Sequence, residues 1–149
     1  MTKKVANMLN EFFTYLNQEY KINRGGCCYV ASIVAKELEK RNIKYSLVGG
    51  YTNSSSNYAR DVRTFLQNAR LNKYMDDNVE CNFGYHLYIT AEKVQLNRNK
   101  CEKYKLLPGL NSKQILNLYK NNFWNSTYRT KNNTLIKNLI QNKFKEVYE

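Results

Sequence analysis

Histidine, proline and tryptophan each occur only once in this chain of 149 residues, and long apolar runs are missing altogether. The chain starts with polar residues that lead into an amphipathic segment, so the sequence predicts neither a secretory signal nor a membrane span. We therefore expect a cytoplasmic protein, in the producing cell or in a host cell, that makes no contact with a membrane. In that reducing setting the four cysteines are expected to be free thiols.

Spacings typical of metal ligands are missing as well. The chain has no Cys-x-x-Cys pair, and the neighbouring residues Cys27 and Cys28 would point in different directions from the start of a helix. The four clustered ligands that a structural zinc site requires are therefore not expected. The sequence predicts no metal and no other cofactor.

Acidic residues are half as frequent as basic ones. The chain has 12 Asp and Glu against 24 Lys and Arg, which gives a net charge of +12. The basic residues are scattered through helical patterns, and no helix-turn-helix, zinc-finger or RNA-recognition pattern is found. The charge therefore indicates either a solvated basic face or a surface for an acidic partner or nucleic acid.

Apolar periodicity predicts one α+β domain over residues 1–149, without internal repeats or linkers. Helical spacing is found from Val5 to Tyr20, from about Cys28 to Arg41, over residues 58–69, from Asn111 onward and from about Thr134 onward. Strand patterns are found over residues 43–48, 83–89 and 94–97, and a Gly49-Gly50 pair ends the first of them. We expect helices packed on a small antiparallel sheet, with an inserted helix between the first two strands and extra helices at the C-terminal end.

A glycine-rich turn leads directly into a pair of thiols. The residues Asn23-Arg24-Gly25-Gly26 precede Cys27-Cys28, and helical spacing begins there. The unpaired N–H groups and the positive dipole end of a helix N-terminus favour thiolate over thiol. A thiol nucleophile also needs a base, and His86 is the one histidine that the chain offers.

The strand that carries His86 is expected to form a hairpin with the strand that ends at Asn97. With a turn at Ala91-Glu92, the opposed pairs are Thr90 with Lys93, Ile89 with Val94 and His86 with Asn97. Directly opposed residues lie close enough for their side chains to touch. Asn97 would then hold the imidazole in one tautomer, as the third member of a catalytic triad does.

A helix-borne Cys, a strand His and an Asn on the adjoining strand, in that order, resemble the papain-like cysteine peptidase superfamily. Its transglutaminase-like and arylamine N-acetyltransferase-like branches share this order. The run from Arg24 to Cys28 is similar to the Arg-Gly-Gly-x-Cys of the acetyltransferases, and Cys28-Tyr29 resembles the Cys-aromatic pair of papain-type peptidases. The distance to Asn42-Ile43 matches the transglutaminase-like pattern better from Cys27.

This resemblance implies a papain-like or transglutaminase-like core and a thiol hydrolase, expected to be a cysteine peptidase that forms an acyl-enzyme with a peptide or protein substrate. Cys28 is the expected nucleophile, with Cys27 as the alternative. His86 is the expected base, and Asn97 orients it. The backbone N–H of Cys28 and the Asn23 amide are the expected oxyanion donors.

Other functions remain open at this point. Transglutaminase, deamidase and acyltransferase reactions use the same thiol chemistry and differ in pocket and acceptor. A non-catalytic binding protein is a further alternative, because tyrosines next to basic residues, as in Tyr119-Lys120 and Tyr128-Arg129, suit nucleic acid or an acidic protein surface. The segment from Tyr51 to Asn78 and the basic C-terminal helices are the expected substrate-selecting walls.

Overall fold

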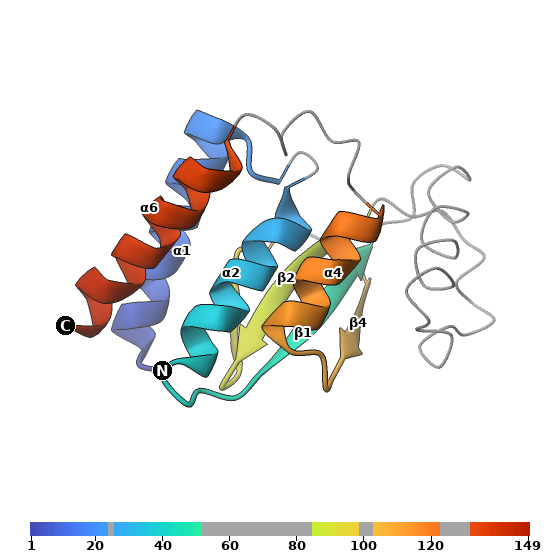
Figure 1. The fold of residues 1–149 in the computed structure, drawn as a ribbon. Coiled ribbons are helices and arrows are strands. Elements are labelled where there is room, and N and C mark those ends of the chain that lie inside the picture. The colour runs from blue at the N-terminus through green and yellow to red at the C-terminus, as the bar shows by residue number, and fades with distance from the viewer. Residues whose placement is uncertain (24–25, 52–84, 99–102, 123–131) are drawn as a thin grey trace.

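The computed structural model in Figure 1 describes residues 1–23, 26–51, 85–98, 103–122 and 132–149. Its helices are α1 (Lys3–Tyr20), α2 (Cys27–Glu39), α4 (Ser112–Asn122) and α6 (Asn133–Tyr148), and its strands are β1 (Tyr45–Tyr51), β2 (Tyr85–Ala91), β3 (Val94–Leu96) and β4 (Lys103–Leu107). The expected mixed α+β architecture is thereby confirmed. The residues that lie outside the described part include the expected inserted helix at 58–69, most of the segment from Tyr51 to Asn78, Arg24, Gly25, Cys81, Cys101 and the Tyr128-Arg129 pair.

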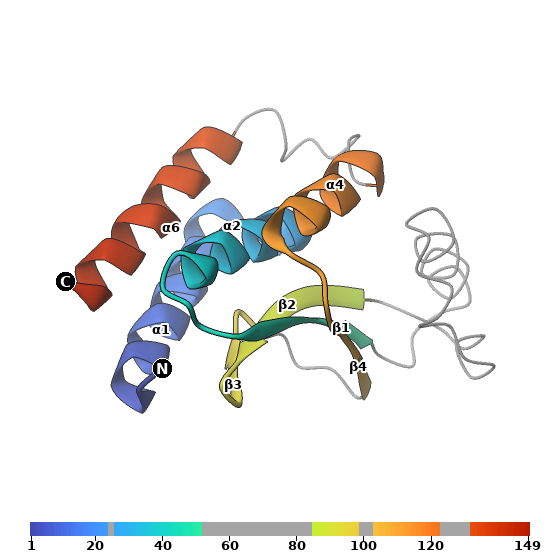
Figure 2. The same ribbon diagram turned by 60° about the horizontal axis from the view of Figure 1, so that its bottom comes forward.

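The four strands form one antiparallel sheet in the order β3-β2-β1-β4. The helices cover one face of this sheet, as Figure 2 shows, and α2 lies in the middle of the helix layer. Apolar side chains of both layers meet between them, and Leu9, Val34, Leu38, Leu47 and Ile89 are among the members of this core. The N-terminus of α2 contacts β2 through Cys27 and the Leu87 backbone.

Local sequence signals place the helix ends well. Asn111 accepts a hydrogen bond from the N–H of Gln114, and the Gln114 side chain accepts one from the N–H of Asn111, with lengths of 2.8 and 2.9 Å. This reciprocal pair is a capping box, and it starts α4 where an N-cap was expected. Asn42 has the left-handed backbone expected after α2, with φ of 56°.

The hairpin between β2 and β3 differs from the expected register. Its two turn residues are Glu92 and Lys93, with φ of 49° and 71°, so that Ala91 pairs with Val94 and Ile89 with Leu96. The expected turn at Ala91-Glu92, with Ile89 facing Val94 and His86 facing Asn97, is wrong. Ala91 is buried in the core while Glu92 and Lys93 are exposed. The turn therefore lies one residue further along the chain than expected, and each β2 residue pairs with a β3 residue two positions later than expected.

The sheet is also larger than the strand patterns predict. β1 runs through Gly49 and Gly50, where we expected it to end, because both glycines pair with β2 on one side and with β4 on the other. β4 itself was not predicted. It is a short edge strand in which two of the five residues are lysines, and this composition gives little strand signal.

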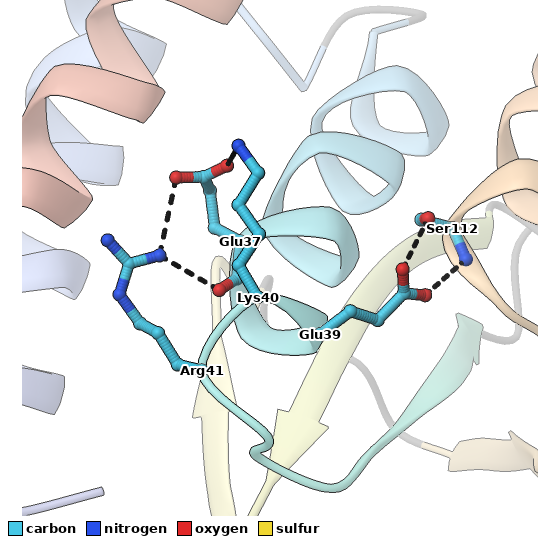
Figure 3. A network of polar contacts seen from close by, with 5 residues as sticks. All are labelled: Glu37, Glu39, Lys40, Arg41 and Ser112. Carbon is cyan, nitrogen blue, oxygen red and sulfur yellow. Dashed lines mark hydrogen bonds and ion pairs between the residues drawn. The ribbon is translucent and has the colours of Figure 1, made fainter.

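A buried carboxylate on α2 binds two basic residues at the end of that helix (Figure 3). The Glu37 side chain is 2% exposed and accepts hydrogen bonds from Lys40 and Arg41 at 2.8 and 3.3 Å. The Arg41 guanidinium lies 5.5 Å from the ring centre of Phe144 and 5.0 Å from that of Tyr148, both on α6. Arg41 therefore contributes an ion pair to Glu37 of α2 and cation–π contacts to α6.

Glu39, two residues further along, holds the start of α4. Its carboxylate accepts hydrogen bonds from the backbone N–H and the hydroxyl of Ser112, both at 2.8 Å (Figure 3), and one from the Tyr45 hydroxyl at 2.6 Å. Burial raises the pKa of Glu39, but these hydrogen bonds outweigh burial and the net pKa is lowered. The ionised carboxylate is thus the form that binds the N-terminus of α4.

Candidate functional site

Cys27 is the first helical residue of α2, and its thiol lies against the sheet. Gly26 is the N-cap and supplies no side-chain cap, so the first N–H groups of α2 are free to face a nearby acceptor. Burial raises the pKa of the Cys27 thiol, while backbone hydrogen bonds from Leu87, Cys28 and Cys27 itself act to lower it. The sulfur therefore lies between the helix N-terminus and the backbone of β2.

The Cys28 side chain points toward α4. Its side chain is 1% exposed, and its thiol donates to the carbonyl of Ile115 on α4 at 3.6 Å. Burial raises the pKa of this thiol well above its ordinary value, and the neighbouring Cys27 raises it further. Cys28 thus packs between α2 and α4, so of the two sulfurs only Cys27 contacts the backbone of β2. The alternative candidate, Cys27, is thus the thiol that lies against the strand carrying His86.

The backbone of His86 lies in β2, directly before Leu87, and pairs with Gly50 of β1. The Leu87 backbone also contacts the Cys27 sulfur, so the strand that carries the one histidine of the chain reaches the Cys27 thiol. The side chain of His86 lies outside the described part of the structure. The relation of its imidazole to Cys27 and Asn97 therefore stays a prediction.

Asn97 directly follows β3 and has a left-handed backbone, φ 64°. Its side-chain amide is hydrogen-bonded through both its nitrogen and its oxygen. Its Nδ2 donates to Asn23 Oδ1 at 3.0 Å, and Asn23 Nδ2 donates back to Asn97 Oδ1 at 3.3 Å. Because Asn97 directly follows Leu96, which pairs with Ile89, the register continued by one residue sets Asn97 opposite Tyr88 rather than opposite His86. Asn23, expected as an oxyanion donor, therefore lies beside the expected orienting residue.

Asn10, on α1, was not identified from the sequence. Its Oδ1 accepts from the backbone N–H of Asn97 at 3.0 Å, and its Nδ2 donates to the carbonyl of Gln95 at 2.9 Å. The Asn10 amide thus acts as a further backbone partner at the end of β3 and fixes the position of Asn97. A signal was present, because Asn10 follows the buried residue Ala6 by one helical turn and is polar on the core-facing side of α1.

A polar cleft opens on the α1 side of this network. It measures about 460 Å³ and is lined by side chains that include Asn10, Asn17, Asn23, Gln95, Asn97 and Arg98. Several of these side-chain amides are already hydrogen-bonded; Asn17 Oδ1, for example, accepts from the backbone N–H of Asn23 at 3.1 Å. The cleft therefore leads solvent to the pair formed by Asn23 and Asn97.

No group of three or more His, Cys, Asp or Glu that could hold a metal ion is found among the described residues. Within the same residues, no helix combines the length and the apolar character needed to cross a membrane. Comparison with protein-family models, with curated proteins and with solved structures finds no match for this chain. Function is therefore argued from the site itself.

Proposed function

We propose that this protein is a thiol hydrolase with a papain-like core, a cysteine peptidase that cleaves amide bonds through Cys27, His86 and Asn97. One observation carries the proposal. The Cys27 sulfur lies at the uncapped start of α2 and contacts the backbone of β2 at Leu87, next in sequence to the one histidine. A thiol at a helix N-terminus and a histidine on the strand that it contacts are the parts that thiol nucleophiles use.

Because burial raises the pKa of Cys27, the thiol needs a base, and His86 is the residue proposed for that role. A buried thiol is neutral near pH 7, so its proton must go to a base before the sulfur can attack. His86 accepts that proton, and the sulfur then adds to the substrate carbonyl. The backbone N–H of Cys27 stabilises the oxyanion, because it belongs to the first turn of α2 and needs no carbonyl partner within the helix.

The tetrahedral intermediate then collapses and the C–N bond breaks. The imidazolium of His86 returns its proton to the leaving amine, and the acyl group stays on sulfur. Water, deprotonated by His86, releases the acid and restores the thiol. Asn97 orients the imidazole, with Asn23 and Asn10 holding Asn97 in place. Transglutaminase, deamidase and acyltransferase reactions would share the acyl-enzyme and differ only in the leaving group or the acceptor.

Alkylation rates of the individual thiols test this proposal. After treatment with iodoacetamide near pH 7, mass spectrometry of peptides separates Cys27 and Cys28 from the other two cysteines of the chain. We expect Cys27 to react about tenfold faster than Cys28 or more, because thiolate is the reactive form and only the Cys27 sulfur has N–H partners that stabilise it. The substitution His86→Ala should slow Cys27 and leave Cys28 unchanged.

A matched pair of serine variants connects reactivity with catalysis. Cys27→Ser should abolish the hydrolysis of p-nitrophenyl acetate and the acetylated enzyme that precedes it, whereas Cys28→Ser should retain both. Asn97→Ala should slow the reaction, and the exposed Asn142→Ala on α6 serves as its control. The proposal is overturned if Cys28 is the faster thiol, or if His86→Ala leaves the Cys27 rate unchanged.

A further inference from the structure

A second depression lies on the outer side of the helix layer, between α2, α4 and α6. It measures about 330 Å³. Its lining includes Tyr29, Ser32 and Ile33 of α2, Leu116 of α4 and Gln141 of α6. We call it the three-helix groove. It contains none of the residues of the proposed catalytic site, so its function is argued separately.

Three lysines lie around the three-helix groove, one from each helix. Lys36, Lys113 and Lys137 are among its lining residues and are exposed. The ammonium groups of these three lysines form no hydrogen bond and no ion pair within the described part of the chain. Glu39 lies near Lys36 and interacts with it electrostatically. The positive charge at the rim thus exceeds the acidic charge beside it.

The polar groups that would bind a phosphate at this place are already occupied. The N-terminus of α4 is the nearest ready-made anion site, but both the N–H and the hydroxyl of Ser112 donate to Glu39. The Ser32 hydroxyl donates to the carbonyl of Tyr29 at 2.6 Å. A small anion would therefore find the Ser112 and Ser32 donors already engaged.

A nucleic acid fits the groove poorly for a related reason. Single strands are held by aromatic rings on which bases stack, and Tyr29 is the aromatic residue that lines the groove. Its ring packs against Tyr119 at 5.2 Å between centres, and its hydroxyl donates to the carbonyl of Asn133. The groove instead presents the apolar surfaces of Ile33 and Leu116 between the lysines.

We propose that the three-helix groove docks a segment of a partner protein in which apolar side chains are flanked by carboxylates. The apolar side chains would cover Ile33 and Leu116, and the carboxylates would reach Lys36, Lys113 and Lys137. Complementary charge supports this occupant, since the lysines have no anionic partner of their own among the described residues apart from the nearby Glu39. Exposed ion pairs are weak, so we expect micromolar affinity that falls as salt is added.

The test measures peptide binding by fluorescence anisotropy, with the Cys27→Ser protein so that no peptide is cleaved. The probe is a synthetic helical peptide with leucines on one face and glutamates on both sides of it. One comparison peptide replaces glutamate by glutamine, another replaces leucine by serine, and a single-stranded oligonucleotide represents nucleic acid. We expect each peptide change to weaken binding about tenfold, and the oligonucleotide to bind less tightly than the acidic peptide.

A charge-matched pair of triple variants locates the binding. Lys36→Gln, Lys113→Gln and Lys137→Gln together should weaken binding of the acidic peptide about tenfold. The control variant replaces Lys4, Lys44 and Lys145 by glutamine; these residues are exposed and do not line the groove. Its affinity for the acidic peptide should stay within about twofold of that of the protein with its lysines unsubstituted. Equal losses in both variants, tighter binding of the oligonucleotide, or no binding of the acidic peptide would each overturn the proposal. All six positions are exposed, and circular dichroism checks that each variant is folded.

Discussion

Arg41→Ala is expected to destabilise the protein by about 2–3 kcal/mol. Arg41 Nη1 donates to the backbone carbonyl of Glu37 at 2.9 Å and to its carboxylate at 3.3 Å. Its guanidinium also contacts the rings of Phe144 and Tyr148. Each ring contact contributes about 0.5–1 kcal/mol. The remainder comes from Glu37, because this buried carboxylate would keep Lys40 as its one cationic partner in the network.

Neighbouring substitutions separate these contributions. Lys40→Ala should cost under about 1 kcal/mol, because the Lys40 side chain is 50% exposed and its ion pair is screened by solvent. Arg41→Lys keeps the charge but loses the planar group that stacks on Phe144 and Tyr148, so an intermediate cost is expected. Glu37→Gln keeps the shape and one acceptor and should cost about 1 kcal/mol.

Urea unfolding followed by far-ultraviolet circular dichroism gives these values, provided that the slope of free energy against urea stays constant across the series. A double-mutant cycle between Arg41→Ala and Tyr148→Leu measures the contact between α2 and α6 directly. We expect a favourable coupling of about 0.5–1 kcal/mol. The reasoning fails if Arg41→Ala costs no more than Lys40→Ala, since the buried carboxylate and the rings would then contribute nothing measurable.

Three further predictions concern the amide network at the end of β3 and the pH dependence of stability. Asn10→Ala removes two hydrogen bonds at the end of β3 and should cost about 1–2 kcal/mol in urea unfolding, while Asn10→Asp, which keeps the acceptor for the Asn97 N–H, should cost less. Folding lowers the pKa of Glu39 below its ordinary value of 4.5. The stability that the ionised Glu39 contributes is therefore present above pH 4.5 and is lost as the pH falls through the folded-state pKa. In thermal melts, Ser112→Ala should make the melting temperature fall less in acid. Burial, followed by the hydrogen bond and the charge of Glu39, raises the pKa of Tyr45 above 10.0, so stability should fall as pH rises beyond 10, and Tyr45→Phe should remove that fall.

Elements specified by local chemistry could be predicted from the sequence, whereas the strand pairing could not. The N-cap at Asn111 and the left-handed residue Asn42 depend on a few neighbouring residues, and both were expected from the sequence. The β2–β3 register depends on which two residues form the turn. Glu92 and Lys93 adopt positive φ without the Gly or Asn that normally marks such a turn, so the sequence carried no signal for the correct register.

The choice between Cys27 and Cys28 shows why a motif match does not fix a site. Successive residues of an α-helix point about 100° apart, so one of two adjacent thiols faces the sheet and the other faces α4. Which thiol faces the sheet depends on the residue at which α2 begins and on the side of α2 that packs on β2. Both of these features depend on residues far away in the sequence. The two cysteines therefore act as an internal control, because they share one helical turn and differ mainly in direction, and a difference in their reactivity measures what β2 contributes.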